Sequence, residues 1–326
     1  MDVMATYAAV RDADLTPMHM NQLILLVQHG TKNLCLKRIF TKYQFLRFSV
    51  KTYRLKEKFK EKKNMKTISV MNIKGGVGKT LTAVTLARGF AKKGFKTLLI
   101  DADGQSNASS SVMPEESFIE NPEKVSLVDF FRNFHPASFE ECIYKTSIEN
   151  LYLLPSNLEL FLAAIDIQHR VGGEKILSKA LAKTDFDYVV IDNNPSVTKL
   201  TDNAIAAANC VICPVAMQEA AIQGMVNTYK LVSQHVEALD LAHPVEFKVL
   251  VTMKPRGEKA EQLIKLMRSI PQLEGNFFST EISYQREPAE WSIRENKSLL
   301  ETYNKKRVIA EEYRQLVDEV IGKVGA

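Results

Sequence analysis

Residues 74–81 of the chain are Lys-Gly-Gly-Val-Gly-Lys-Thr-Leu. A short apolar run over residues 67–72 precedes this stretch, and apolar residues at helical spacing follow it. The expected local structure is a buried strand, a glycine-rich turn and a helix, which is the context in which such turns bind phosphate. Glycines bring backbone N–H groups up to phosphate oxygens because they adopt dihedrals closed to other residues. The stretch predicts a nucleotide site with contacts from Lys74, Gly75, Gly76, Val77, Gly78, Lys79, Thr80 and Leu81.

Two side chains of this turn have expected roles in phosphate chemistry. Lys79 should reach the β- and γ-phosphates, and the hydroxyl of Thr80 should ligate Mg²⁺. The helix that begins near Thr80 should point the positive end of its dipole at the same phosphates. The sequence therefore predicts a nucleotide that is bound together with a metal ion.

The turn departs from the usual P-loop at its start. Ile73 stands where the usual motif has glycine, and Lys74 adds a second lysine to the loop. With this lysine the stretch resembles the deviant Walker A motif of the ParA/MinD family of P-loop ATPases, and the resemblance extends over nearly all of residues 65–326. It implies that ATP and Mg²⁺ are the cofactors. It also implies that Lys74 reaches across a dimer interface to the nucleotide of the partner subunit.

A second motif, Asp-Ala-Asp-Gly-Gln-Ser-Asn, occupies residues 101–107 at the end of a predicted strand. Ligands of open α/β sheets bind at the carboxyl ends of the strands. The motif resembles Asp-x-Asp-x-Gln-x-Asn of the same family. By that resemblance Asp103 orients and activates the attacking water, and Asp101 helps to organise the Mg²⁺ shell. The catalytic residues implied are Lys74, Lys79 and Asp103.

The third motif is a hydrophobic strand that ends in a carboxylate, residues 187–192. It resembles a Walker B motif, in which Asp192 would hold Mg²⁺ through a water molecule, so the implied metal site is Thr80, Asp101 and Asp192. The chain departs from the family at three places. Asn194 replaces a proline and leaves the stiffness of this switch loop open, Leu81 replaces a threonine near the α-phosphate, and Gly104 replaces a common proline.

From Met65 onward, strand and helix patterns alternate, which predicts an α/β fold with a doubly wound, mostly parallel sheet flanked by helices. The resemblance implies that this is the deviant Walker P-loop NTPase fold. Strands are expected at 67–72, 96–100, 151–155, 188–191, 211–215, 247–252 and 277–282. Helices are expected after the glycine-rich turn, near 127–131, 158–169, 174–183, 221–238 and 259–269, and at 306–321.

The expected domains are a basic N-terminal extension, residues 1–64, and a ParA-like P-loop ATPase domain, residues 65–326. The extension holds thirteen Lys/Arg against five Asp/Glu, whereas the remainder is slightly acidic. We expect the extension to be disordered or not native, with Met65 as the natural start. The alternative is a DNA-binding arm that reads an operator.

Composition and cysteine usage place the chain in a broad class. Hydrophobic residues make up 45% and charged residues 25%, as in ordinary globular proteins, and no apolar run is long enough to span a membrane. Four cysteines in a chain of this length do not make a disulfide framework, which favours the cytoplasm. Cys210 and Cys213 should face opposite sides of one strand as buried apolar residues. The six histidines form no ligand pair and receive no role.

The C-terminal region bears on what an ATPase of this kind would act on. A segment after the last predicted strand resembles the region of partition ATPases that contributes basic residues to a nonspecific DNA surface. The candidate phosphate contacts are Lys254, Arg256, Lys259, Arg286, Arg294 and Lys297. The last helix carries acidic residues, unlike the basic membrane helix of MinD-like members, so we expect it to pack on the body and no stable membrane association.

Together these patterns favour a ParA/Soj-type ATPase that partitions a plasmid or chromosome. The implied partners are a second copy of the chain, nonspecific DNA and a ParB-like centromere-binding protein that stimulates slow hydrolysis, on the nucleoid in the cytoplasm. Two alternatives stay open. One is a MinD-like ATPase that positions machinery at a membrane, and the other is a DNA-binding regulator whose ATPase activity is incidental.

Overall fold

The computed structural model describes residues 65–113, 124–132, 137–241, 243–285 and 308–324. These residues belong to one of the two units into which the chain divides, Lys63–Ala326. The predictions for residues 1–64, and those for Arg286, Arg294 and Lys297, lie outside the described residues.

The described residues form a seven-stranded sheet in the order β3-β4-β2-β5-β1-β6-β7. Its strands are β1 (Lys66–Val70), β2 (Thr97–Ala102), β3 (Tyr144–Lys145), β4 (Leu151–Leu154), β5 (Tyr188–Asn193), β6 (Cys210–Ala216) and β7 (Glu246–Thr252). Every neighbouring pair is parallel except β3 with β4. The strand before the glycine-rich turn, β1, lies in the interior of the sheet between β5 and β6. The predicted fold class is confirmed.

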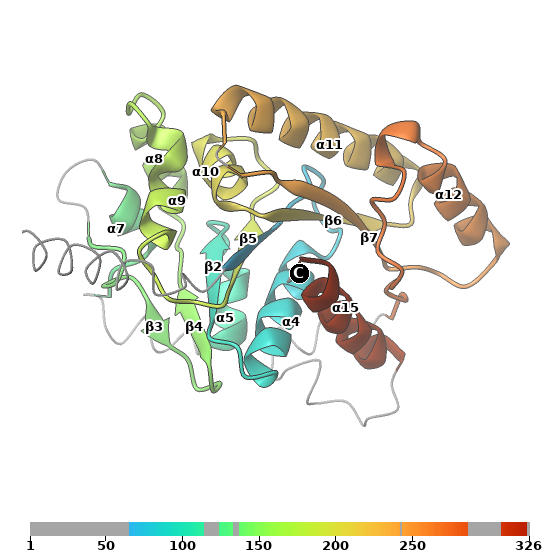
Figure 1. Cartoon of the computed structure of the whole chain (residues 1–326), viewed down its shortest axis with the longest axis horizontal. Helices are drawn as coiled ribbons and strands as arrows, with labels where there is room; N and C mark the ends of the chain where they lie inside the picture. The colour runs from blue at the N-terminus through green and yellow to red at the C-terminus, as the bar shows by residue number, and fades with distance from the viewer. Residues whose placement is uncertain (1–64, 114–123, 133–136, 242, 286–307, 325–326) are drawn as a thin grey trace, which may run out of the picture. The chain divides into compact units, whose positions relative to one another are not determined.

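Helices cover both faces of the sheet (Figure 1). One face carries α4 (Lys79–Lys92), α5 (Asn107–Val112) and α15 (Val308–Val324). The other carries α7 (Leu127–Phe131), α8 (Leu160–Asp166), α9 (Ile176–Leu181), α10 (Lys199–Ala207), α11 (Glu219–Leu239) and α12 (Glu258–Arg268), with short 3₁₀ turns at Gly173–Lys175 and Pro271–Leu273. Strands buried on both faces favour continuous apolar runs, as in β5 and β6, whereas β1 also buries Thr67 and Ser69.

Strand β6 shows how its side chains divide between the two cores. Cys210 and Ile212 belong to the core under α4 and α15, whereas Val211 and Cys213 belong to the core under α10 and α11. The prediction that the two cysteines are buried on opposite sides is confirmed. Within the part of the chain that the structure describes, no group of three His, Cys, Asp or Glu side chains is placed to hold a metal ion.

The strand predicted at 277–282 is wrong. The segment makes only isolated parallel bridges, Val249 with Phe277 and Lys254 with Ser283. The N–H groups of Phe278 and Ile282 donate to carbonyls of β7 at 3.0 and 2.8 Å. Between them, Glu319 of α15 accepts from the N–H groups of Ser279 and Thr280, at 2.7 and 2.9 Å, and after them Glu312 accepts from that of Ser283 at 2.8 Å. Side-chain acceptors interrupt the pairing with β7, so no continuous ladder forms.

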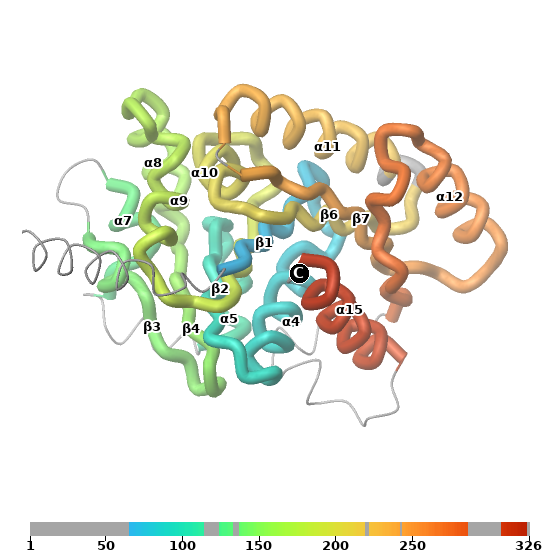
Figure 2. The backbone as a smooth tube through the Cα atoms, in the orientation of Figure 1, coloured from blue at the N-terminus to red at the C-terminus, as the bar shows by residue number. Residues whose placement is uncertain are grey.

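The last helix packs on the body, as predicted. Its Tyr313 is fully buried, and the hydroxyl of Tyr313 lies 3.3 Å from that of Thr82 on α4. Gly89 on α4 permits this approach, because a Cβ there would lie 2.4 Å from a methyl group of Val317. Figure 2 shows the two helices side by side. Among the described helices, none combines the length and apolar character that a membrane span requires.

Candidate nucleotide-binding and hydrolysis site

The glycine-rich turn connects β1 to α4. Gly78, the residue before the helix, has φ 87°, and Gly76 has φ 71°, a left-handed region that side chains with a Cβ rarely adopt. Between them, Val77 is buried, and its carbonyl accepts a 2.9 Å hydrogen bond from the hydroxyl of Thr252 at the end of β7. Gly75 and Gly76 are exposed. The turn is therefore fixed at one point and open to solvent at its glycines.

Asn72 fixes the start of the turn. Its Nδ2 donates to the carbonyl of Pro214 on β6 at 2.8 Å, and its Oδ1 accepts from the backbone N–H of Lys74 at 2.8 Å. Thr228 of α11 also contacts this point, since its hydroxyl accepts from the N–H of Ile73 at 3.3 Å. This role of Asn72 was not predicted from the sequence. A polar amide at the end of a largely apolar strand was the feature that could have indicated it.

Lys79 is the first residue of α4, and its side chain is buried against the glycine-rich turn. The residue is 8% exposed, and its Nζ donates to the carbonyl oxygen of Lys74 at 3.1 Å. Burial lowers the pKa of Lys79, and the nearby Asp192 and Asp103 carboxylates offset part of that effect. A buried ammonium held by one backbone carbonyl can exchange that contact for a phosphate oxygen, which binds a cation more strongly.

Lys74 points elsewhere. Its ammonium donates to Oε1 of Gln218, the residue before α11, at 3.1 Å. The two lysines of the loop therefore have different partners. The ammonium of Lys79 contacts the loop itself, whereas that of Lys74 contacts the residue before α11.

Asp192 is a buried carboxylate without hydrogen bonds. It is 0% exposed, near the end of β5, and neither of its oxygens has a hydrogen-bond partner in the described part of the chain. Burial raises the pKa of Asp192 well above its usual value and Asp101 adds to the rise, while the Thr80 hydroxyl and the Lys79 ammonium oppose it. An unsatisfied buried carboxylate is costly. A hard cation with oxygen ligands would satisfy it, so Thr80 and Asp192 fit Mg²⁺.

Asp101 differs from Asp192, although the two are paired across β2 and β5. One oxygen of Asp101 accepts from the N–H of Asp103 at 3.1 Å, and the other accepts from the N–H and the hydroxyl of Ser109, both at 2.7 Å. Burial raises the pKa of Asp101 to about 6. Its hydrogen bonds hold Asp103 and the start of α5 in place, and its predicted part in the metal shell stays a prediction.

Asp103 lies at the half-buried rim of the same strand ends. Its Oδ1 accepts from the N–H of Gln105 at 3.0 Å and faces Nδ2 of Asn194 at 3.4 Å. The structure thus brings together the loop lysine, the buried Asp192 and the half-buried Asp103 at the carboxyl ends of β1, β5 and β2.

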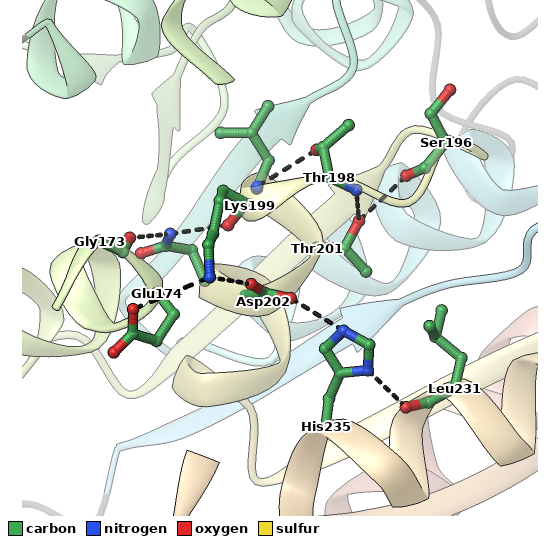
Figure 3. A network of polar contacts seen from close by, with 11 residues as sticks. Gly173, Glu174, Ser196, Thr198, Lys199, Thr201, Asp202, Leu231 and His235 are labelled. Carbon is green, nitrogen blue, oxygen red and sulfur yellow. Dashed lines mark hydrogen bonds and ion pairs between the residues drawn. The ribbon is translucent and has the colours of Figure 1, made fainter. Parts of the chain in front are cut away.

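The loop after β5 is anchored to helix α10. Thr198 and Thr201 form a capping box, and the Thr201 hydroxyl donates to the carbonyl of Ser196 at 3.0 Å (Figure 3). The next residue, Asp202, binds Lys199 at 2.9 Å and His235 of α11 at 3.0 Å. Sequence reasoning gave His235 no role, but it joins two helices of the face opposite α4.

The candidate DNA contacts do not share one environment. Lys254 lies between Glu261 and Glu281, 2.6 Å from each, and these carboxylates raise its pKa. Arg256 and Lys259, by contrast, are exposed on the loop and helix that follow.

A parallel sheet with a glycine-rich turn after its central strand, and a buried carboxylate on the adjoining strand, defines the chain as a P-loop NTPase. Residues 65–241, more than half of the chain, match the family model described as AAA domain. The sporulation initiation inhibitor protein Soj of Bacillus subtilis is 36% identical over 61% of this chain and 78% of that protein. The chain belongs to the ParA/Soj-type partition ATPases of this family.

Solved structures agree on the fold. The structure of apo McdA from Cyanthece is similar with a TM-score of 0.67 and 22% identity, over 79% of this chain and 100% of that chain. A plasmid partition protein of Borrelia burgdorferi, bound to AMPPNP, is similar with a TM-score of 0.61 and 25% identity, over 80% of this chain and 100% of that chain.

Proposed function

We propose that this ATPase dimerises on ATP, binds DNA nonspecifically and drives plasmid or chromosome partition together with a ParB-like centromere-binding protein. The observation that carries the proposal is the second lysine of the loop. Lys74 directs its ammonium out of its own loop to Gln218, as expected of a group that serves the nucleotide of a second subunit. The likeness to Soj of Bacillus subtilis supports the same conclusion.

Hydrolysis in this proposal needs little covalent work from the protein. The loop N–H groups bind the phosphates, and Lys79 exchanges the Lys74 carbonyl for a phosphate oxygen. Thr80 and Asp192 would hold Mg²⁺, which supplies positive charge beside the phosphates when bound. Asp103 orients the attacking water. We propose that turnover is slow until the partner protein stimulates it.

The dependence of dimerisation on ATP follows from the thermodynamic linkage between nucleotide binding and subunit association. ATP can favour a closed pair of subunits only through contacts that it makes in that state and not in the free subunit. A charge provided in trans by Lys74 is such a contact, because it is absent from the single chain.

For DNA we propose Arg256 and Lys259 as backbone contacts, together with Arg286, Arg294 and Lys297. Phosphate contacts of this type carry no sequence preference and weaken with salt. Lys254 should contribute less, because two glutamates already neutralise it.

The test is binding to plain duplex DNA across a salt series, with ATP and with ADP. Binding that needs ATP, falls steeply with salt and ignores sequence supports the proposal. DNA binding that is equal with both nucleotides would refute the ATP-dependent step. ATP-dependent co-sedimentation with lipid vesicles, without DNA binding, would favour a MinD-like function instead.

A further inference from the structure

Asn194 lies between two fixed points of the loop that follows β5. On one side, Nδ2 of the buried Asn193 donates to the Ser69 hydroxyl at 2.8 Å and to the carbonyls of Val70 and Ile191. On the other side, Ser196 is held by the capping box of α10, as Figure 3 shows. The side chain of Asn194 therefore starts from a backbone position with little freedom.

The amide of Asn194 has a defined orientation. Its Oδ1 accepts from the N–H of Ser196 at 2.6 Å, and an N–H can only donate. The NH₂ group must then face the other way, where Oδ1 of Asp103 lies at 3.4 Å. A carboxylate accepts hydrogen bonds, so the two groups are complementary.

The contacts of Asp103 are one-sided. Both donors, the Gln105 N–H and the Asn194 amide, meet Oδ1. In the ranges that the structure describes, no donor contacts Oδ2. Within those ranges the protein therefore holds one oxygen of the carboxylate and not the other. The two groups meet because Ala102 of β2 is paired with Asn193 of β5, so that Asp103 and Asn194 follow side by side.

We infer that Asn194 is a positioning residue, whose amide aims the Asp103 carboxylate at the attacking water. This inference rests on the proposed hydrolytic role of Asp103. The family that the chain resembles has proline at this position. Proline offers no side-chain donor, so the contact is a feature of this chain.

Three substitutions separate this role from a purely structural one. Asn194→Asp keeps an oxygen for the Ser196 N–H but replaces the donor that faces Asp103 with an acceptor of the same size. Asn194→Ala removes both interactions, and Asn194→Gln keeps the amide on a longer stem. If the donor matters, kcat should fall about tenfold in Asn194→Asp, less in Asn194→Ala, and recover in part in Asn194→Gln. If only the turn matters, Asn194→Asp should equal the wild type and Asn194→Ala should be the slowest.

The measurements are kcat and KM for ATP, the Kd of a non-hydrolysable ATP analogue and Tm, on the full chain. The matched control is Val197→Ala, an exposed side chain of the same loop, which should leave all four unchanged. The inference requires kcat to change while KM, Kd and Tm stay the same. Asn194→Asp at or above the rate of Asn194→Ala, or parallel losses of binding and Tm, would overturn it. Asp103→Ala, run alongside, keeps the two ideas apart: full turnover in that variant contradicts the role of Asp103 itself.

Discussion

The ammonium of Lys79 and the carbonyl oxygen of Lys74 are 3.1 Å apart, so the loop binds its own buried lysine. Phosphate must displace this contact, and the exchange is favourable because an anion holds an ammonium better than a neutral carbonyl does. The ammonium of Lys79 therefore already lies in the loop before nucleotide binds, close to the carboxylates of Asp192 and Asp103.

Lys79→Ala should remove most of the thermal stabilisation that ATP and Mg²⁺ give the wild type. A ligand at a hundred times its Kd adds about 2.7 kcal/mol to the free energy of unfolding, and a lost phosphate contact reduces that gain. Differential scanning fluorimetry with and without ATP measures it. Lys92→Ala, at the exposed end of the same helix, is the control and should shift normally. An undiminished shift in Lys79→Ala would place the phosphates elsewhere.

Lys74→Ala should still bind nucleotide but fail to dimerise, because its ammonium lies outside its own loop. Light scattering of the variant with a non-hydrolysable ATP analogue gives the mass directly. Lys259→Ala, an exposed lysine far along the chain, should dimerise like the wild type. Stable ATP-dependent dimers of Lys74→Ala would count against a role in trans.

Asp103→Ala should leave ATP binding, dimerisation and DNA binding intact while hydrolysis stops. The side chain is at the rim of the site, and its partners are Gln105 and Asn194 rather than residues of the glycine-rich turn, so its loss should affect the reaction alone. Phosphate release and analogue binding are measured on the same preparation. Turnover near the wild-type rate would refute the role assigned to Asp103.

Asp192→Asn should stabilise the nucleotide-free protein, by about 1–3 kcal/mol at neutral pH, because it removes a buried carboxylate without hydrogen bonds. Burial raises the folded-state pKa of Asp192 above 3.8, so the folded chain binds this proton more tightly than the unfolded chain. The penalty is therefore absent near pH 4 and grows as pH rises through the folded pKa. Urea unfolding at several pH values should show a gain that shrinks on acidification.

Asp101→Asn provides the matched comparison for that measurement. Asp101 is equally buried, but its oxygens accept three hydrogen bonds, from Asp103 and Ser109. The amide cannot accept them all, so this variant should lose stability where Asp192→Asn gains it. A change of the same sign in the free energy of unfolding of both variants would contradict the difference between the two carboxylates.

The sequence alone predicts the features that are local in the chain. Strand, turn and helix around Gly78 follow from glycines and an apolar period within about fifteen residues, and the central strands follow from continuous apolar runs. The short helix α5, rich in serine, was not predicted because nothing in residues 107–112 favours a helix by itself. The contacts of Asp101 with Ser109 hold its first turn.

Contacts between distant segments could not be predicted. Residues 277–282 have the composition of a strand, yet the Glu319 carboxylate of α15 accepts from the N–H groups of Ser279 and Thr280 in the middle of the segment. Lys254 looked like a free cation because Glu281, which binds it, is far along the chain. Asn72 and Asn194 were visible as polar residues beside motifs, but their partners are fixed only when β1, β2, β5 and β6 are assembled.

His235→Ala should destabilise the protein by about 1–2 kcal/mol, because it leaves the largely buried carboxylate of Asp202 with Lys199 alone. Both ring nitrogens of His235 meet oxygen atoms, Nε2 that of Asp202 and Nδ1 the carbonyl of Leu231 at 2.8 Å (Figure 3). Chemical denaturation measures the loss, and His169→Ala, an exposed histidine, should change nothing. Because Asp202 follows Thr201, which binds Ser196 in the loop that holds Asn194, the variant should also lower kcat slightly. A loss of stability with an unchanged kcat would limit the network to joining α10 and α11.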